Sequence, residues 1–195
     1  MKIITFSGLD GSGKTTQIKF FQKYLEKNNF KYKKIHIIEN SLANRILKKK
    51  KNPKKDQSVK KACIFKIFLR KIALLIDIVI FKIFLFFKKK KFDVLIFDRY
   101  FFDYLLNIYY LENRNKAQIQ PFLKSLIPKP DLAVYLRLDY KEADKRKNEQ
   151  GAKYLKKKFK YFEQLKKELN FFQVDSTKDK EIVKNIIRKK FEKLS

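Results

Sequence analysis

The sequence has very few of the residues that build disulfides, metal centres and flexible turns. Its 195 residues include one Cys, one His, no Trp, four Gly and four Pro. A lone Cys63 excludes an intrachain disulfide, so a reducing cytoplasm is the simplest compartment. Cys63 and the lone His36 do not form a His/Cys pattern with the spacing of a metal site. We expect His36 to be a structural strand residue. Because a strand-like run starts at the first residues, we expect no signal peptide.

Acidic residues are also scarce, since 20 Asp and Glu stand against 49 Lys and Arg, a formal net charge of +29. This excess favours anionic partners such as nucleotides, polyanions or an anionic membrane surface. However, Lys, Phe, Ile, Asn and Tyr are all abundant, as expected of an AT-rich genome, and codon bias would also produce the charge. We therefore predict no specific nucleic-acid partner and leave weak polyanion or membrane contact open.

The few glycines are concentrated near the start of the chain. Gly8, Gly11 and Gly13 all lie in the segment Gly8-Leu9-Asp10-Gly11-Ser12-Gly13-Lys14-Thr15. A β-prone run over residues 2–6 precedes this segment, and a helical pattern over residues 16–27 follows it. Gly, four residues, then Gly-Lys-Ser/Thr between a strand and a helix is the pattern of a P-loop that binds triphosphates.

The chemistry of triphosphate oxygens explains why these residue types occur together. Glycines let the backbone N–H groups converge on the phosphates, and the helix adds its positive N-terminal end. Lys14 can reach the β- and γ-phosphates, and the Thr15 hydroxyl can bind Mg²⁺. We expect Lys14 to be a catalytic residue in a surface loop. The predicted ATP-binding residues are Gly8, Asp10, Gly11, Ser12, Gly13, Lys14, Thr15 and Thr16.

Strand-like and helical segments alternate along the rest of the chain. Strands are predicted over residues 2–6, 34–39, 92–97, 132–136 and 171–174, and helices over residues 16–27, 104–124, 141–148, 153–169 and 180–194. A Lys-rich surface loop is expected over residues 40–59. This alternation predicts an α/β fold in which helices flank a doubly wound parallel sheet as three layers. We assign residues 1–195 to a single domain.

The most apolar stretch runs from Ala62 to Phe87. Charged residues such as Lys66, Asp77 and Lys82 interrupt it, so no run approaches the ~18 residues that a membrane span needs. We predict one or two buried helices with a thin polar edge. A helix that rests on a membrane surface is the alternative.

The predicted strand over residues 92–97 is apolar throughout and ends in Asp98-Arg99-Tyr100. A continuous apolar run is typical of a parallel strand buried on both faces. Open α/β sheets place their ligands at the carboxyl ends of such strands. Asp98 is therefore predicted to support Mg²⁺, and Arg99 to hold a second phosphate.

These motifs resemble those of the thymidylate kinase family of nucleoside monophosphate kinases. The segment from Gly8 to Gln17 is similar to the family's opening almost letter for letter, and Asp98-Arg99-Tyr100 resembles its DRY motif. Pro130-Asp131-Leu132 and Val174-Asp175-Ser176 resemble later segments, so the resemblance covers nearly the whole chain in register.

The resemblance implies a sheet order of 2-3-1-4-5, MgATP as the donor and a monophosphate, first dTMP, as the acceptor. It assigns acceptor binding to Asp10, Arg99 and Tyr100, and metal binding to Thr15 and Asp98. Residues 40–91 would form an acceptor-side helical region and residues 141–160 a lid. Because the P-loop lacks Arg, the lid cation would be Arg146, Lys147 or one of the lysines from Lys153 to Lys158. A homodimer is among the possible assemblies.

Two segments depart from the family pattern on the acceptor side. Glu39-Asn40-Ser41-Leu42 stands where the family has an E-P-G-G-T-type segment, and Phe101 to Leu105 replaces a segment that shapes the thymine pocket. A wall of aromatic residues, including Phe101, Phe102 and Tyr104, is expected there instead. Phosphoryl transfer is therefore better supported than thymidine specificity. The alternatives are a kinase for a non-nucleotide acceptor and a P-loop protein that binds polyanions or membranes with little turnover.

Overall fold

The computed structural model describes residues 1–37, 64–88, 90–146 and 151–194. Five strands form one parallel sheet in the order β2-β3-β1-β4-β5. The strands are β1 (Lys2–Gly8), β2 (Tyr32–Ile35), β3 (Val94–Asp98), β4 (Leu132–Arg137) and β5 (Phe172–Asp175). The predicted fold class and strand order are both confirmed.

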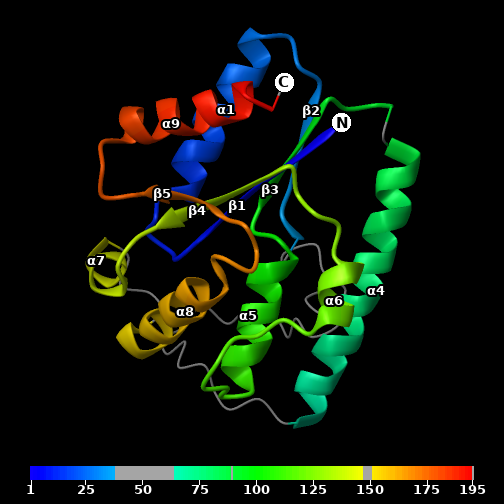
Figure 1. Ribbon diagram of the computed structural model, residues 1–195, viewed down its shortest axis with the longest axis vertical. Helices are drawn as coiled ribbons and strands as arrows, with labels where there is room; N and C mark the ends of the chain where they lie inside the picture. Colours follow the sequence, from blue (N-terminus) through cyan, green and yellow to red (C-terminus); the bar gives the residue numbers. More distant parts are fainter. Residues whose placement is uncertain (38–63, 89, 147–150, 195) are drawn as a thin grey trace, which may run out of the picture.

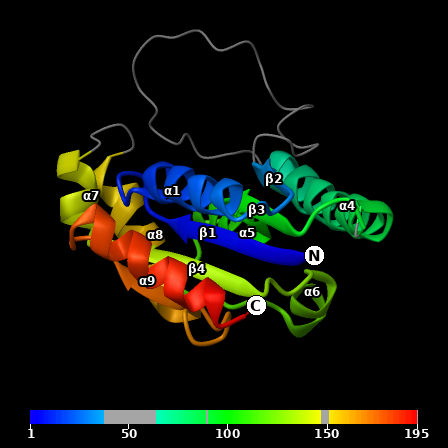
Figure 2. The same cartoon turned by 90° about the horizontal axis from the view of Figure 1, so that it is seen from above.

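Helices cover both faces of this sheet (Figure 1). The described helices are α1 (Lys14–Lys27), α4 (Ile64–Lys88), α5 (Phe101–Leu111), α6 (Pro121–Leu126), α7 (Tyr140–Arg146), α8 (Ala152–Leu165) and α9 (Lys180–Glu192). Helices α1 and α9 lie side by side on one face, with α5 and α8 on the other (Figure 1; Figure 2). Side chains of β1 divide between two cores: Ile4 packs with α1 and α9, whereas Ile3 belongs to the core of α5 and α8. The sheet is thus buried on both faces, as its apolar strands require.

Several element boundaries differ from the prediction. Strand β2 begins at Tyr32 and ends before His36, so His36 follows the strand. The single helix predicted over residues 104–124 is two helices, α5 and α6. Asn113, with a φ of 56°, follows the end of α5, and Pro121 starts α6 as its first residue. A left-handed residue ends a helix, and proline suits a first helical position. The predicted loop over residues 40–59 lies outside the described residues.

The prediction of one or two buried helices within residues 62–87 is wrong about burial. Helix α4 is one continuous helix at the side of the fold (Figure 1), and it buries only Ala73, Leu74, Ile78 and Phe81. The other large apolar side chains are exposed: Ile64, Phe65, Phe68, Ile72, Leu75, Ile76, Val79, Ile80, Ile83, Phe86 and Phe87. An apolar face opposite the core cannot be distinguished from a buried one by composition. No described helix has the length and hydropathy needed to cross a membrane.

Candidate active site

The loop between β1 and α1 has the backbone geometry of a phosphate cradle. Gly11 and Gly13 adopt φ angles of 87° and 82°, and Gly13 is the N-cap of α1. A Cβ atom on Gly8 would lie 2.6 Å from the carbonyl oxygen of Leu136 on β4. Glycine is therefore required for conformation at Gly11 and Gly13 and for space at Gly8. The buried Ser12 hydroxyl has no hydrogen-bond partner among the described residues, as expected of a group that awaits a ligand.

Lys14 is buried rather than exposed, which corrects its predicted place in a surface loop. Its side chain is 7% exposed, and its Nζ donates hydrogen bonds to the carbonyl oxygens of Gly8 (3.0 Å) and Leu9 (2.6 Å). Burial, reinforced by the charge of Arg99, lowers the pKa of Lys14 to about 7, although Asp10 opposes the shift. The Lys14 ammonium thus donates hydrogen bonds to carbonyl oxygens of its own loop, at the place where a triphosphate would bind.

Asp10 and Arg99 form an ion pair between the P-loop and the end of β3. Arg99 has a φ of 70°, uncommon for a residue with a side chain, and its N–H donates to the carbonyl of Phe6 on β1 (3.0 Å). Burial disfavours the charge of Asp10, but Arg99 and Lys14 outweigh it and lower the pKa of that carboxyl. The two predicted acceptor-side residues are therefore brought together.

Asp103 is a site residue that the sequence reasoning did not identify. It is fully buried, and its carboxylate accepts hydrogen bonds from the Ser7 hydroxyl (2.5 Å) and the Tyr100 backbone N–H (3.0 Å). These bonds tie the first turn of α5 to β1 and so fix the segment that carries Arg99. The signal was an acidic residue three positions after the N-cap, which is typical of a capping residue.

Tyr100 and the residues after it do not face the site as expected. The Tyr100 hydroxyl donates to the carbonyl of Pro128 (2.7 Å), and its buried ring contacts Phe97 and Phe101. The aromatic wall predicted from Phe101, Phe102 and Tyr104 belongs to the hydrophobic core. The polar groups that recognise an acceptor must therefore belong to other residues.

Thr15 and Asp98 suit the ligand preferences of Mg²⁺. Asp98 ends β3 directly beside Phe6 of β1, and its carboxylate lies 3.6 Å from the Nζ of Lys34. Thr15 and Thr16 are exposed in the first turn of α1. Within the described residues no three His, Cys, Asp or Glu side chains converge as a metal cluster. A hydroxyl, one carboxylate and phosphate oxygens are what a magnesium–nucleotide site needs, so these residues fit the ion.

Arg146 lies near Gly11 of the P-loop. It ends α7, where its side chain is exposed and donates to the Ser176 carbonyl after β5 (3.2 Å). A Cβ atom on Gly11 would lie 3.4 Å from the Arg146 Cβ. Arg146 thus borders the loop but is not brought together with Asp10 and Arg99.

Lys158 of α8 is a buried lysine that contacts α5. It is 2% exposed, and its Nζ donates to the Asn107 side-chain oxygen and to the Tyr154 hydroxyl, at 3.1 Å each. Its charge acts on both Asp10 and Lys14. Among the lysines of residues 153–158 named as lid candidates, only Lys158 is buried.

Comparison with known proteins agrees with this arrangement. Residues 6–187 match the family model described as thymidylate kinase, which is most of the chain. The chain belongs to the thymidylate kinase family. Membership in this family makes it a nucleoside or nucleotide kinase, of a kind that generally uses ATP and Mg²⁺. None of the curated proteins searched matches the sequence.

A solved structure of another protein has the same fold as this chain. It is a deoxyadenosine kinase from M. mycoides with the products dCMP and a flexible dCDP bound. The two chains are 19% identical, with a TM-score of 0.61 over 99% of this chain and 100% of the other. The likeness therefore concerns the fold and not the substrate.

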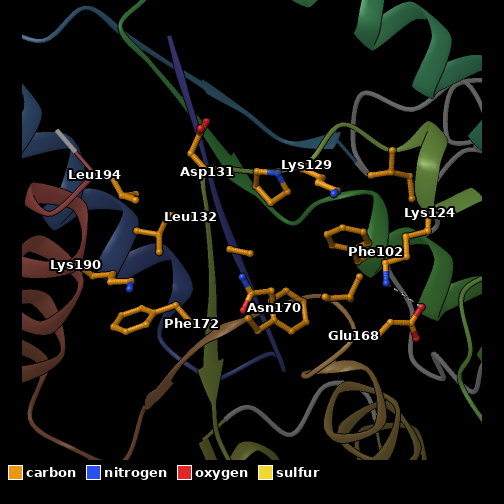
Figure 3. A pocket seen from close by; sticks show the side chains of 15 residues that line it. Phe102, Lys124, Lys129, Asp131, Leu132, Glu168, Asn170, Phe172, Lys190 and Leu194 are labelled. Carbon is orange, nitrogen blue, oxygen red and sulfur yellow. Dashed lines mark ion pairs between the residues drawn. The ribbon is translucent and has the colours of Figure 1, made fainter.

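A separate pocket lies away from the kinase site (Figure 3). It has a volume of about 550 Å³ and lies between the start of β4, α6 and the end of α9. Asp131 and Leu132 line it at the amino end of β4, and Lys124 pairs with Glu168 across it (3.7 Å). Parallel α/β sheets bind ligands at the carboxyl ends of their strands, so this pocket is not the candidate site.

Proposed function

We propose that the protein transfers the γ-phosphoryl group of MgATP to a nucleoside monophosphate, with dTMP as the first candidate. The observation that carries this proposal is the contact of the Asp10 carboxylate with both Lys14 and Arg99. It joins the triphosphate loop to the end of β3. A pure triphosphate-binding protein has no use for a guanidinium beside the ammonium of its loop.

On the donor side, the loop residues have the groups that a triphosphate requires. The N–H groups of Gly11 to Thr15 and the N-terminal end of α1 face the phosphates, and Lys14 exchanges its loop carbonyls for phosphate oxygens. Thr15 and Asp98 would hold Mg²⁺, which when bound neutralises phosphate charge. On the acceptor side, Arg99 would bind the acceptor phosphate and Asp10 the sugar hydroxyl. Catalysis then rests on positioning and charge stabilisation.

The test is consumption of ATP that depends on an added acceptor. Purified protein is assayed with dTMP, dUMP, other nucleoside monophosphates, the matching nucleosides and phosphorylated sugars. We expect turnover with at least one monophosphate, and loss of that turnover in Lys14→Met but not in Lys19→Met, which changes an exposed lysine of the same helix. Turnover with phosphorylated sugars alone would instead support a non-nucleotide acceptor.

A second candidate function is binding to an anionic membrane surface through α4. At 100° per residue its exposed apolar side chains lie opposite the core face. The exposed Lys66 and Lys82 lie on the two opposite borders of that apolar face. A helix with an apolar face bordered by lysines suits an anionic lipid interface. If a second copy of this chain docked on α4 instead, the positively charged lysines at these borders would lie close to the same lysines of that copy.

Vesicle flotation tests this second proposal separately from the kinase assay. Vesicles of phosphatidylcholine with phosphatidylserine should carry the protein, and vesicles of phosphatidylcholine alone should carry much less. Phe68→Asp with Val79→Asp places charges at the centre of the apolar face and should abolish flotation. A protein that sediments as a dimer and ignores both vesicles would show that α4 binds a second copy instead.

A further inference from the structure

Lys158 is a buried ammonium group whose hydrogen bonds within the described residues all go to neutral partners. It donates to the side-chain oxygen of Asn107 and to the hydroxyl of Tyr154, and Tyr154 itself donates to Asn107 (3.1 Å). No carboxylate of the described residues lies within 4 Å of its Nζ. A lysine ammonium has three N–H donors, so one donor remains available.

This ammonium lies within the electrostatic reach of the kinase site and contacts the helix that follows Arg99. Asn107, its partner, is on α5, the helix that begins two residues after Arg99. The charge of Lys158 affects the ionisation of Asp10 and Lys14, and Tyr154 affects that of Arg99. Helices α5 and α8 pack against each other, and the Lys158–Tyr154–Asn107 cluster joins α8 to the helix that follows Arg99.

The charge of Lys158 is not balanced without a ligand. Lys14 and Arg99 share the carboxylate of Asp10, whereas the buried Lys158 has no ion-pair partner among the described residues. Burying a charge without an ion partner is costly, and this cost is removed when an anion occupies the space. A phosphate monoester carries close to two negative charges at neutral pH and offers three acceptor oxygens.

We propose that Lys158, together with Arg99, binds the phosphate group of the acceptor. The proposal rests on the kinase function above and deepens it by assigning a further binding residue for the acceptor phosphate. The acceptor is a phosphate monoester, and a phosphate-free nucleoside lacks the group that these two cations bind. Asn107 and Tyr154 act as positioning residues that orient the ammonium through its two other donors.

Direct binding tests this proposal without relying on turnover. Titration calorimetry measures dTMP, thymidine and ATP against the wild type, Lys158→Met and Lys160→Met, an exposed lysine of the same helix. We expect Lys158→Met to weaken dTMP binding about 10- to 100-fold, the size of a lost charged hydrogen bond. ATP affinity should stay within about twofold, and Lys160→Met should resemble the wild type. Lys158→Arg, which keeps the charge, should retain part of the dTMP affinity.

Three results would overturn the proposal: unchanged dTMP affinity in Lys158→Met, an equal loss of ATP affinity in that variant, or wild-type protein that binds thymidine as tightly as dTMP. Far-UV circular dichroism checks that Lys158→Met is folded, and Lys158→Gln replaces it if it is not. A wild type that binds dTMP through Lys158 yet shows no turnover would reject the kinase function and leave this phosphate site standing.

Discussion

The guanidinium of Arg99 donates a hydrogen bond to the carboxylate of Asp10, which joins the residue after β3 to the loop after β1. The same carboxylate lies 3.7 Å from the Nζ of Lys14. One acidic side chain therefore sits between the cation proposed for the donor and the cation proposed for the acceptor. It keeps the two positive groups close before any phosphate arrives.

Replacement of Asp10 by Asn should destabilise the protein and change how phosphate affects it. The variant leaves two buried cations without their shared carboxylate, and a lost charged hydrogen bond costs about 2 kcal/mol. Inorganic phosphate should therefore stabilise Asp10→Asn more than it stabilises the wild type. Urea unfolding with and without phosphate measures both effects, and Glu142→Gln, which removes an exposed ion pair to Lys145, is the control. Equal stability of Asp10→Asn and wild type would show that the ion pair contributes nothing.

Lys14→Met should abolish phosphoryl transfer and at the same time stabilise the fold. The ammonium is needed to bind the triphosphate, but burial in the free protein works against its charge. Removing it relieves that cost, so the free energy of unfolding near pH 6 should rise. Activity assays and urea unfolding test the two halves of the prediction. A variant that loses activity and also unfolds more easily would mean that the bonds to Gly8 and Leu9 are stabilising overall.

The pH dependence of ATP binding should report the same lysine. The pKa of Lys14 is lowered to about 7 in the free protein. Above that pH the folded chain binds fewer protons than the unfolded chain, so the contribution of Lys14 to stability rises with pH up to its ordinary pKa. ATP requires the charged form, so its affinity should fall as pH rises above about 7, with proton uptake on binding. Calorimetry at about pH 8 in two buffers of different ionisation enthalpy measures that uptake. Absence of uptake would place the Lys14 pKa well above 8.

The P-loop could be predicted because it depends on a local sequence pattern. The strand order could be predicted because the family that the motifs resemble shares one topology. The glycines of the loop are required by backbone angles and close contacts, which a short motif records directly. Asp98 and Arg99 follow an apolar strand, and parallel strands bring their carboxyl ends to one edge. These residues can therefore be identified from the sequence alone.

Burial was harder to predict, because it depends on what packs against an element. Nothing in the sequence indicates that Lys14 and Lys158 are buried, yet both are enclosed by neighbouring elements. Conversely, α4 looks like a core helix, yet only Ala73, Leu74, Ile78 and Phe81 are buried. Distinguishing these cases requires knowing which helix faces are covered.

Asp98→Asn should lower the rate and raise the Mg²⁺ concentration needed for half-maximal activity. The carboxylate ends β3 beside Phe6, and the amide that replaces it is a weaker ligand for a hard cation. The fold should change little, because Asp98 has a single long contact to the partly exposed Lys34. Titration of activity with Mg²⁺ measures the shift, and Lys34→Met serves as the control for the loss of that contact. Identical Mg²⁺ dependence in Asp98→Asn and wild type would assign Asp98 a structural role.

The last prediction concerns how selectively the protein accepts dTMP. Sites that discriminate by ~10⁴ or more do so with polar groups that the wrong ligand leaves unpaired. Here the segment after Arg99 places Phe101, Phe102 and Tyr104 in the core, and Asn107, Tyr154 and Lys158 form a polar cluster between α5 and α8. In the proposed arrangement these three groups serve the acceptor phosphate, which every monophosphate shares. We therefore expect kcat/KM for dTMP to exceed that for other nucleoside monophosphates by less than about 10²-fold. Competition assays with paired monophosphates measure this ratio. A preference for dTMP above that range would mean that residues outside this cluster read the base.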